Sequence, residues 1–135
     1  MRVTKTAITV QGFHIDRYGH VNNARYLEFF EQARWEYIEE HLNPQIPEKK
    51  NWQFTVVEIN IKYKKPLFFK DEIVIETRIE EVSYVKTHMS QKIYLKKDYE
   101  LATLGKVSFI IVDIPTGKPL RVTDDLKKYL ETGAI

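Results

Sequence analysis

The chain has 135 residues, of which 43% are hydrophobic and 30% are charged, and its formal net charge is +2. This balance predicts one globular domain over residues 1–135 with a usable core, and the charge is too small to indicate a nucleic-acid partner by itself. The sequence has no cysteine, which excludes disulfides, thiolate zinc sites and cysteine nucleophiles. We see neither a signal peptide nor a membrane-spanning run, so we expect a cytoplasmic protein.

The first part of the chain predicts a strand, a loop and a long helix. Residues 3–14 mix apolar and polar positions and indicate a strand, and residues 15–22 form the loop. From about residue 23 to residue 41 apolar side chains recur at helical spacing. The side chains that define this stripe are Tyr26, Phe30, Ala33 and Tyr37.

Residues at both ends of this helix mark its boundaries. Asn22 or Asn23 is a good N-cap, and Asn43-Pro44 ends the helix. We expect a polar loop over residues 44–52.

Alternating apolar and polar positions predict that most of the remainder is antiparallel strand. The segments that follow this pattern lie at residues 57–63, 73–80, 92–96 and 101–114. The segment 101–114 is more continuously apolar, which favours a central position in the sheet. Thr123 is expected to cap a short final helix. One long helix against one antiparallel sheet is an α+β arrangement.

The most informative segment is the loop before the long helix. An acid, Asp16, is followed by Gly19, His20 and the pair Asn22-Asn23, and the helix begins at once. The start of a helix leaves backbone N–H groups free to stabilise developing negative charge. An acid beside such a site can hydrolyse an activated acyl group.

Each of these residues has a simpler interpretation. Asp16 is either a general base or nucleophile, or an acid that stabilises the helix terminus. His20 either orients Asp16 or is a loop histidine bonded to backbone. Glu31 either holds the attacking water or pairs with Arg34, three residues further along the helix. The four histidines show no metal-ligand spacing, so we expect no metal.

Nearly the whole chain resembles the hotdog-fold acyl-CoA thioesterases of the 4-hydroxybenzoyl-CoA thioesterase class, most closely the FadM/YbgC type. The sequence words that carry the resemblance are Phe13-His14-Ile15-Asp16, Gly19-His20-Val21-Asn22-Asn23, Ala24-Arg25-Tyr26-Leu27-Glu28-Phe29, Glu31-x-Ala33-Arg34-Trp35 and Val57-x-Ile59-Asn60-Ile61-x-Tyr63-x-Lys65-Pro66. The resemblance implies a hotdog fold, in which about five antiparallel strands wrap around the long helix, with a short helix at the C-terminus.

The resemblance also implies a function. The family hydrolyses fatty or aromatic acyl-CoA to free acid and CoA, and needs no cofactor besides the CoA of the substrate. Its acid corresponds to Asp16, and its oxyanion donor is a backbone N–H that corresponds to Asn23. The site lies between two subunits that pair their sheets edge to edge, as a homodimer or homotetramer.

Other residues are expected to bind substrate. Gly19, Val21, Asn22 and Tyr26 surround the helix start, and aromatic residues such as Tyr26 either line an acyl tunnel or belong to the core. Lys62, Lys64, Lys65 and Lys86 either contact the CoA phosphates or lie on a solvated face. Many relatives carry a different turn where this chain has Ser83 to His88, so contacts from Ser83 and Lys86 depart from the family pattern.

Three other functions fit parts of the sequence. The chain could hydrolyse acyl groups on an acidic acyl carrier protein, or bind acyl-CoA on the same fold without turnover. A basic, aromatic, strand-rich chain could also bind single-stranded nucleic acid, but this explains neither Asp16 nor the helix start.

Overall fold

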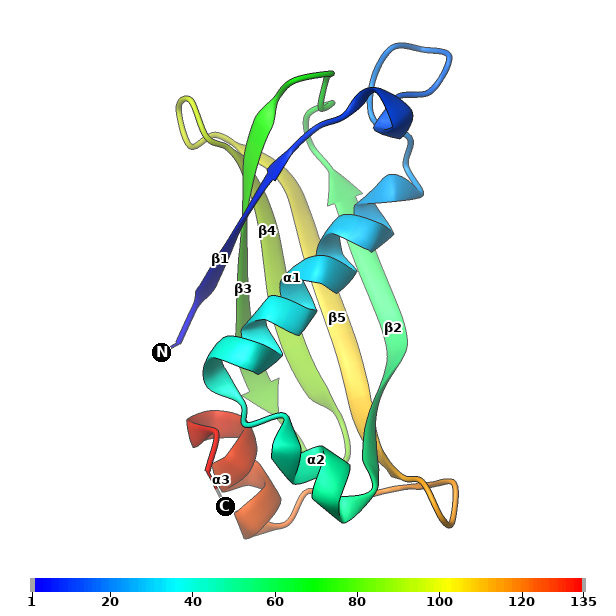
Figure 1. The fold of residues 1–135 in the computed structure, drawn as a ribbon, viewed down its shortest axis with the longest axis vertical. Helices are drawn as coiled ribbons and strands as arrows, with labels where there is room; N and C mark the ends of the chain where they lie inside the picture. Colours follow the sequence, from blue (N-terminus) through cyan, green and yellow to red (C-terminus); the bar gives the residue numbers. More distant parts are fainter. Residues whose placement is uncertain (1, 135) are drawn as a thin grey trace.

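In the computed structural model, which describes residues 2–134, a curled antiparallel sheet wraps one side of a long helix (Figure 1). The elements in chain order are β1 (Thr4–Thr9), a 3₁₀ turn (Gly12–His14), α1 (Arg25–His41), α2 (Gln45–Lys50), β2 (Trp52–Tyr63), β3 (Glu72–Val82), β4 (Thr87–Leu95), β5 (Leu101–Asp113), β6 (Lys118–Pro119) and α3 (Asp124–Thr132). The expected α+β architecture, with its hotdog-like sheet and C-terminal helix, is confirmed. None of the helices described is long and apolar enough to cross a membrane.

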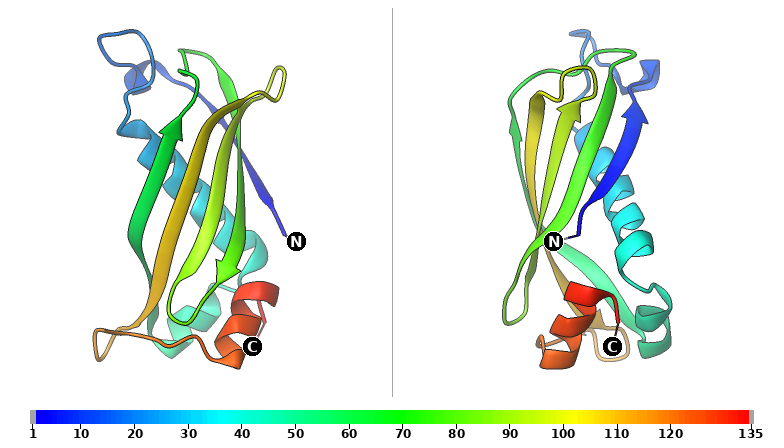
Figure 2. Two further views of the ribbon diagram at one scale, coloured as in Figure 1. Left: turned by 180° about the vertical axis from the view of Figure 1, so that it is seen from behind. Right: turned by 90° about the vertical axis from the view of Figure 1, so that its left-hand side faces the viewer.

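The strand order places β2 at one edge of the sheet. The main path runs β1-β3-β4-β5-β2, and the short β6 pairs with β5. All of these pairs are antiparallel. Across residues 2–134, β2 pairs with β5 alone, so its other side is open (Figure 2).

Helix α1 lies diagonally across the concave face and supplies much of the core (Figure 1). Its buried side chains are Tyr26, Phe29, Phe30, Ala33 and Tyr37. The helix approaches β5 closely at Gly105, where an added Cβ would lie 2.7 Å from Phe30 Cζ. Real Cβ atoms do not come this close to a carbon, so glycine at this position sets how near α1 lies to the sheet.

Helix α3 covers the opposite end of the sheet from the loop that carries Asp16 (Figure 1). Thr123 caps it as predicted, because its Oγ1 accepts a hydrogen bond from Leu126 N at 3.3 Å. The Tyr129 hydroxyl donates to Asn43 O at 3.1 Å and joins α3 to the segment that follows α1. This end of the molecule therefore has its own apolar cluster beneath α3.

Several sequence predictions of boundaries are wrong. Residues 45–50 form α2 rather than a polar loop, because Pro44 occupies the N-cap, where no N–H is needed, and buried Pro47 lies within the first turn. The first strand ends at Thr9. The central position predicted for the segment 101–114 is confirmed, because β5 lies between β4 and β2 and is not an edge strand.

Buried tyrosines make the fold sensitive to alkali. Burial raises the pKa of Tyr26 and of Tyr129 to about 12, and it also raises the pKa of Tyr37. In the unfolded chain these hydroxyls ionise near 10, so between the two values the folded state holds protons that the unfolded state loses. Their contribution to stability is complete below pH 10 and is lost as pH rises through 12.

We therefore expect the free energy of unfolding to fall steeply between about pH 10 and about pH 12. Urea titrations at a series of pH values measure it, and Tyr129→Phe should make the fall shallower. A stability that stays level across this interval would contradict the prediction.

Candidate active site

The loop between the 3₁₀ turn and α1 folds back as a tight turn. Asp16 N donates to His20 O at 3.0 Å, and Gly19 N donates to Asp16 O at 3.1 Å. Gly19 has a φ of 88°, a left-handed conformation that glycine adopts without steric cost. Val21 N then donates to Leu67 O at 2.8 Å, so the turn is attached to the loop between β2 and β3.

The carboxylate of Asp16 is half-buried on this turn. Its Oδ1 accepts the backbone N–H of Tyr18 at 2.8 Å, and Oδ2 has no hydrogen bond to any residue between 2 and 134. One oxygen is thus held by the turn, while the other is free for a water or a substrate.

Helix α1 begins at Arg25, about two residues after the predicted start, so the prediction of Asn22 or Asn23 as the N-cap is wrong. Ala24 is the N-cap residue and makes no side-chain cap bond, while Asn22 Oδ1 accepts the N–H of Ala24 at 2.9 Å. Asn22 therefore bonds the backbone just before the helix, and neither of the predicted asparagines occupies the N-cap. In the part of the chain described, neither the backbone N–H nor the side chain of Asn23 has a partner. The helix start leaves a free donor there, as the sequence predicts.

A cavity of about 310 Å³ lies at the start of α1. Its lining residues are His20, Val21, Asn23, Tyr26, Tyr63, Lys64, Lys65 and Pro66. The Tyr63 hydroxyl donates to Asn23 O at 3.1 Å, and the rings of Tyr63 and Tyr26 meet edge to face at 4.8 Å. The end of β2 therefore holds the start of α1 in place.

This cavity brings together His20, Val21, Asn23 and Tyr26 among the residues expected at the site. Asp16, Gly19 and Asn22 belong to the adjoining turn, not to the cavity lining. His20 Nδ1 faces Val21 O at 3.4 Å, and no hydrogen bond joins its ring to Asp16 within residues 2–134. The simpler interpretation of His20, as a loop histidine beside backbone, fits these contacts.

Two expected residues lie far from the cavity. Ser83 and Lys86 belong to the hairpin between β3 and β4, where Ser83 N and Oγ both bond Lys86 O. This hairpin is at the end of the sheet near α3, away from the Asp16 turn (Figure 1). Within one copy of the chain they therefore do not meet Asp16.

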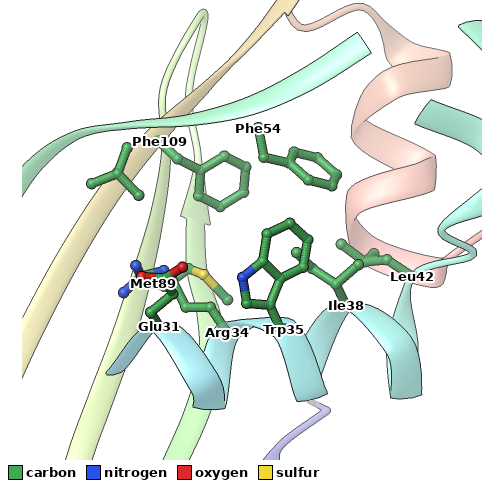
Figure 3. Close-up of a pocket in the computed structure, with 9 residues that line it drawn as sticks. Glu31, Arg34, Trp35, Ile38, Leu42, Phe54, Met89 and Phe109 are labelled. Carbon is green, nitrogen blue, oxygen red and sulfur yellow. The ribbon is translucent and has the colours of Figure 1, made fainter. Parts of the chain in front are cut away.

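A second cavity, of about 320 Å³, lies further along the seam between α1 and β2 (Figure 3). Its lining residues are Glu31, Arg34, Trp35, Ile38, Leu42, Phe54, Val56, Met89 and Phe109. The volume is within the range of small-molecule sites, and most of the lining is apolar. Glu31 therefore lies on a different cavity from Asn23, on the same helix.

A buried amide, that of Gln91, holds Arg34, one of the residues that line this second cavity. Gln91 is fully buried; its Nε2 donates to Phe30 O at 2.9 Å and to Thr77 Oγ1 at 3.1 Å. Its Oε1 accepts from Arg34 Nη1 at 3.1 Å. The ion pair predicted between Glu31 and Arg34 is not formed within 4.0 Å in the described chain. Burial lowers the pKa of Arg34, and the charge of Glu31 opposes this shift.

Sequence reasoning missed two residues that the structure makes important. Tyr63 is an aromatic residue at the end of an alternating strand, and its position beside Lys64 and Lys65 was the available signal. Gln91 is a polar residue on the apolar face of its strand, between Met89 and Ile93, and this break in the alternation marks a buried polar contact.

Comparisons with known proteins show which family the chain belongs to. The profile of the thioesterase-like superfamily matches residues 11–130. The long-chain acyl-CoA thioesterase FadM of Escherichia coli is 36% identical over 127 residues, which cover 94% of this chain and 96% of FadM.

Solved structures agree with the sequence comparison. YbaW of Escherichia coli, described as a probable thioesterase, has 36% identity and a TM-score of 0.90 over 94% of this chain and 96% of its own. The DHNA-CoA thioesterase of Staphylococcus aureus has 27% identity and a TM-score of 0.83 over 97% and 88% of the two chains.

Proposed function

Because this chain belongs to the thioesterase-like superfamily, we propose that it is a cytoplasmic acyl-CoA thioesterase that cleaves a fatty or aromatic acyl-CoA to free acid and CoA. The observation that carries the proposal is the unpartnered N–H of Asn23, a residue that lines the cavity beside the Asp16 turn. Medium and long fatty chains are the preferred class, because the second cavity offers an apolar space along the same seam.

In the proposed mechanism Asp16 activates the nucleophile and the start of α1 stabilises the oxyanion. The free oxygen of Asp16 takes a proton from water, and the resulting hydroxide attacks the thioester carbonyl carbon. The carbonyl oxygen gains negative charge and accepts a hydrogen bond from Asn23 N–H. Collapse of this intermediate breaks the C–S bond, and the proton held by Asp16 passes to the departing sulfur, so that the acid and the CoA thiol are released and the carboxylate is restored. Alternatively, Asp16 attacks the carbonyl carbon directly and expels CoA thiolate, and water then cleaves the resulting anhydride.

No metal or redox cofactor takes part in this scheme. Dialysis against a chelator should therefore leave turnover unchanged.

We also propose that two copies pair through the open edge of β2. An unpaired edge of 12 residues is a template for another strand, and Val56, Val57 and Tyr63 are exposed along it. Antiparallel pairing about a two-fold axis sets the Trp52 end of one β2 beside the Tyr63 end of the other. The hairpin of Ser83 and Lys86 in one copy then approaches the Asp16 turn of the other.

The functional test is thiol release from short, medium, long and aromatic acyl-CoAs. Turnover that peaks for one class supports the enzyme and identifies its substrate. A folded protein that releases no thiol from any CoA ester would contradict the proposal. Two further measurements then separate the remaining functions. A higher kcat/KM for acyl groups on an acyl carrier protein favours a thioesterase for that carrier. Binding of acyl-CoA without turnover favours a non-catalytic binding protein.

Lys86→Ala tests the contribution of the hairpin. We expect a higher KM for acyl-CoA and little change in kcat, because a lysine that holds a CoA phosphate acts on binding alone. Lys97→Ala, in the exposed turn between β4 and β5, is the matched control and should leave KM unchanged. An unchanged KM in Lys86→Ala would remove this residue from the site.

A further inference from the structure

Large aromatic side chains are exposed together at the end of the molecule that carries the Asp16 turn. We call this set the aromatic tip. Its members and their exposed fractions are Phe13 at 68%, Tyr18 at 80%, Phe68 at 49% and Phe69 at 54%. Folded proteins rarely leave several such side chains exposed in one place unless they form an interaction surface.

The tip is built from two loops that are bonded to each other. Lys70 N donates to Val10 O at 3.0 Å, and Val21 N donates to Leu67 O at 2.8 Å. Phe69 packs near Gly12, where an added Cβ would lie 4.0 Å from the ring. The two loops that carry these aromatic side chains are therefore joined to each other by backbone hydrogen bonds.

Cations outnumber acids in the two segments that form the aromatic tip. Segments 11–20 and 64–71 contain four cations, Arg17, Lys64, Lys65 and Lys70, and two acids. Lys65 pairs with Glu100, while the other three cations have no carboxylate within 4.0 Å in the described residues.

Both acids of the tip are bonded to its backbone. Asp16 Oδ1 accepts Tyr18 N at 2.8 Å, and Asp71 Oδ2 accepts Phe68 N at 2.8 Å. Each carboxylate is half-buried, whereas Arg17 and Lys70 are exposed. The outward charge of the tip is positive, although the chain as a whole is almost neutral.

We propose that the aromatic tip docks on the surface of an anionic lipid bilayer. Aromatic side chains flanked by lysine and arginine suit this interface, because the rings enter the boundary between headgroups and acyl chains while the cations meet anionic headgroups. Lys70 Nζ lies over the Phe69 ring at 5.4 Å, which sets a charge directly beside an inserting side chain. Four large aromatic residues favour a lipid surface over an acidic protein, for which the cations alone would suffice.

The role that we give to docking rests on the proposed acyl-CoA thioesterase function. The loop between β2 and β3 supplies both Phe68 and Phe69 of the tip and Lys64 to Pro66 of the cavity at Asn23. A docked protein would therefore present that cavity close to the bilayer, where an acyl-CoA with a long chain partitions. Binding to the bilayer itself requires no turnover.

Vesicle co-sedimentation tests the docking. We expect the wild type to bind vesicles of phosphatidylcholine with phosphatidylglycerol, to bind pure phosphatidylcholine weakly, and to be released by salt. The double variant Phe68→Ser/Phe69→Ser should lower the partition coefficient at least about tenfold, because two aromatic side chains no longer insert. The matched control is Ile114→Ser, which removes a side chain 53% exposed in the turn at the opposite end.

A second readout locates the contact. Tryptophan introduced as Phe69→Trp should be quenched by brominated lipids, whereas Ile114→Trp should not. The proposal is overturned if the wild type does not bind anionic vesicles, or if the double variant binds as well as the wild type. It is also overturned if the double variant differs in solution mass from the wild type, which would make the tip an interface between copies. The proposal is overturned in favour of an acidic protein partner if the wild type binds an acyl carrier protein, the double variant does not, and neither binds vesicles.

These outcomes separate the two proposals. Vesicle binding without any thiol release would contradict the proposed function alone. Thiol release from dispersed acyl-CoA that is equal in wild type and double variant, with no vesicle binding, would contradict the docking alone.

Discussion

Asp16→Asn is expected to lower kcat at least ~100-fold while the protein stays folded, which is the scale of a lost acid–base group. The amide keeps the shape of the side chain and can still accept the hydrogen bond from Tyr18 N. It has no negative charge with which to take a proton from water or to attack the thioester. The loss should therefore appear in thiol release and not in the thermal unfolding midpoint.

The chain contains a matched control for this substitution. Asp71 is also half-buried and also accepts a backbone N–H at 2.8 Å, from Phe68. Asp71→Asn removes a charge of the same kind outside the proposed reaction and should retain turnover. Full activity in Asp16→Asn, or an equal loss in both variants, would contradict the mechanism.

Isotope labelling separates the two roles of Asp16. In a single turnover in ¹⁸O water, a general base leaves its own carboxylate unlabelled. A nucleophile whose anhydride is cleaved at the aspartyl carbon carries the label, which mass spectrometry of the peptide containing Asp16 would detect.

Gly105→Ala is expected to destabilise the fold by about 1–3 kcal/mol, the cost of overpacking a core. The new Cβ would lie 2.7 Å and 2.8 Å from two atoms of the Phe30 ring and 3.1 Å from the carbonyl oxygen of Gln91. The ring and the strand are both buried, so α1 or β5 must move. Chemical denaturation measures the change in the free energy of unfolding.

Phe30→Leu provides the internal check. A smaller side chain leaves room for the Cβ, so the double variant Gly105→Ala/Phe30→Leu should lose less stability than the sum of the two single variants. Gly12→Ala is the control, because the nearest contact of its Cβ would be at 4.0 Å. Additive losses in the cycle would show that the contact with Phe30 is not the cause.

Sequence periodicity predicted the helix, most strands and the capped C-terminal helix, because each depends on local spacing or on one capping residue. The helix α2 was missed because prolines usually indicate a loop, and only the structure shows that Pro44 and Pro47 lie where a helix tolerates them. The apolar run at residues 101–114 also predicted that β5 is an interior strand, and the strand order confirms this.

The candidate site shows the same division. A free donor at the helix start followed from the general geometry of helices, and the structure places it at Asn23. The hydrogen bond from Tyr63 to Asn23 and the hydrogen bond from Arg34 to Gln91 join residues 40 and 57 positions apart. Such contacts depend on how α1 crosses the sheet, which no local pattern in the sequence encodes.

The hydrogen bond from Tyr63 to Asn23 O links the activity of the protein to its own concentration. Tyr63 is the last residue of the edge strand, so the strand that would join two copies also holds Asn23, the residue whose N–H would bind the oxyanion. Protomers that separate would keep this bond, which lies within one chain, but the end of β2 that makes it would no longer be held by a partner strand. Specific activity would then decline on dilution before any protomer unfolds, and assembly and turnover would follow a single equilibrium.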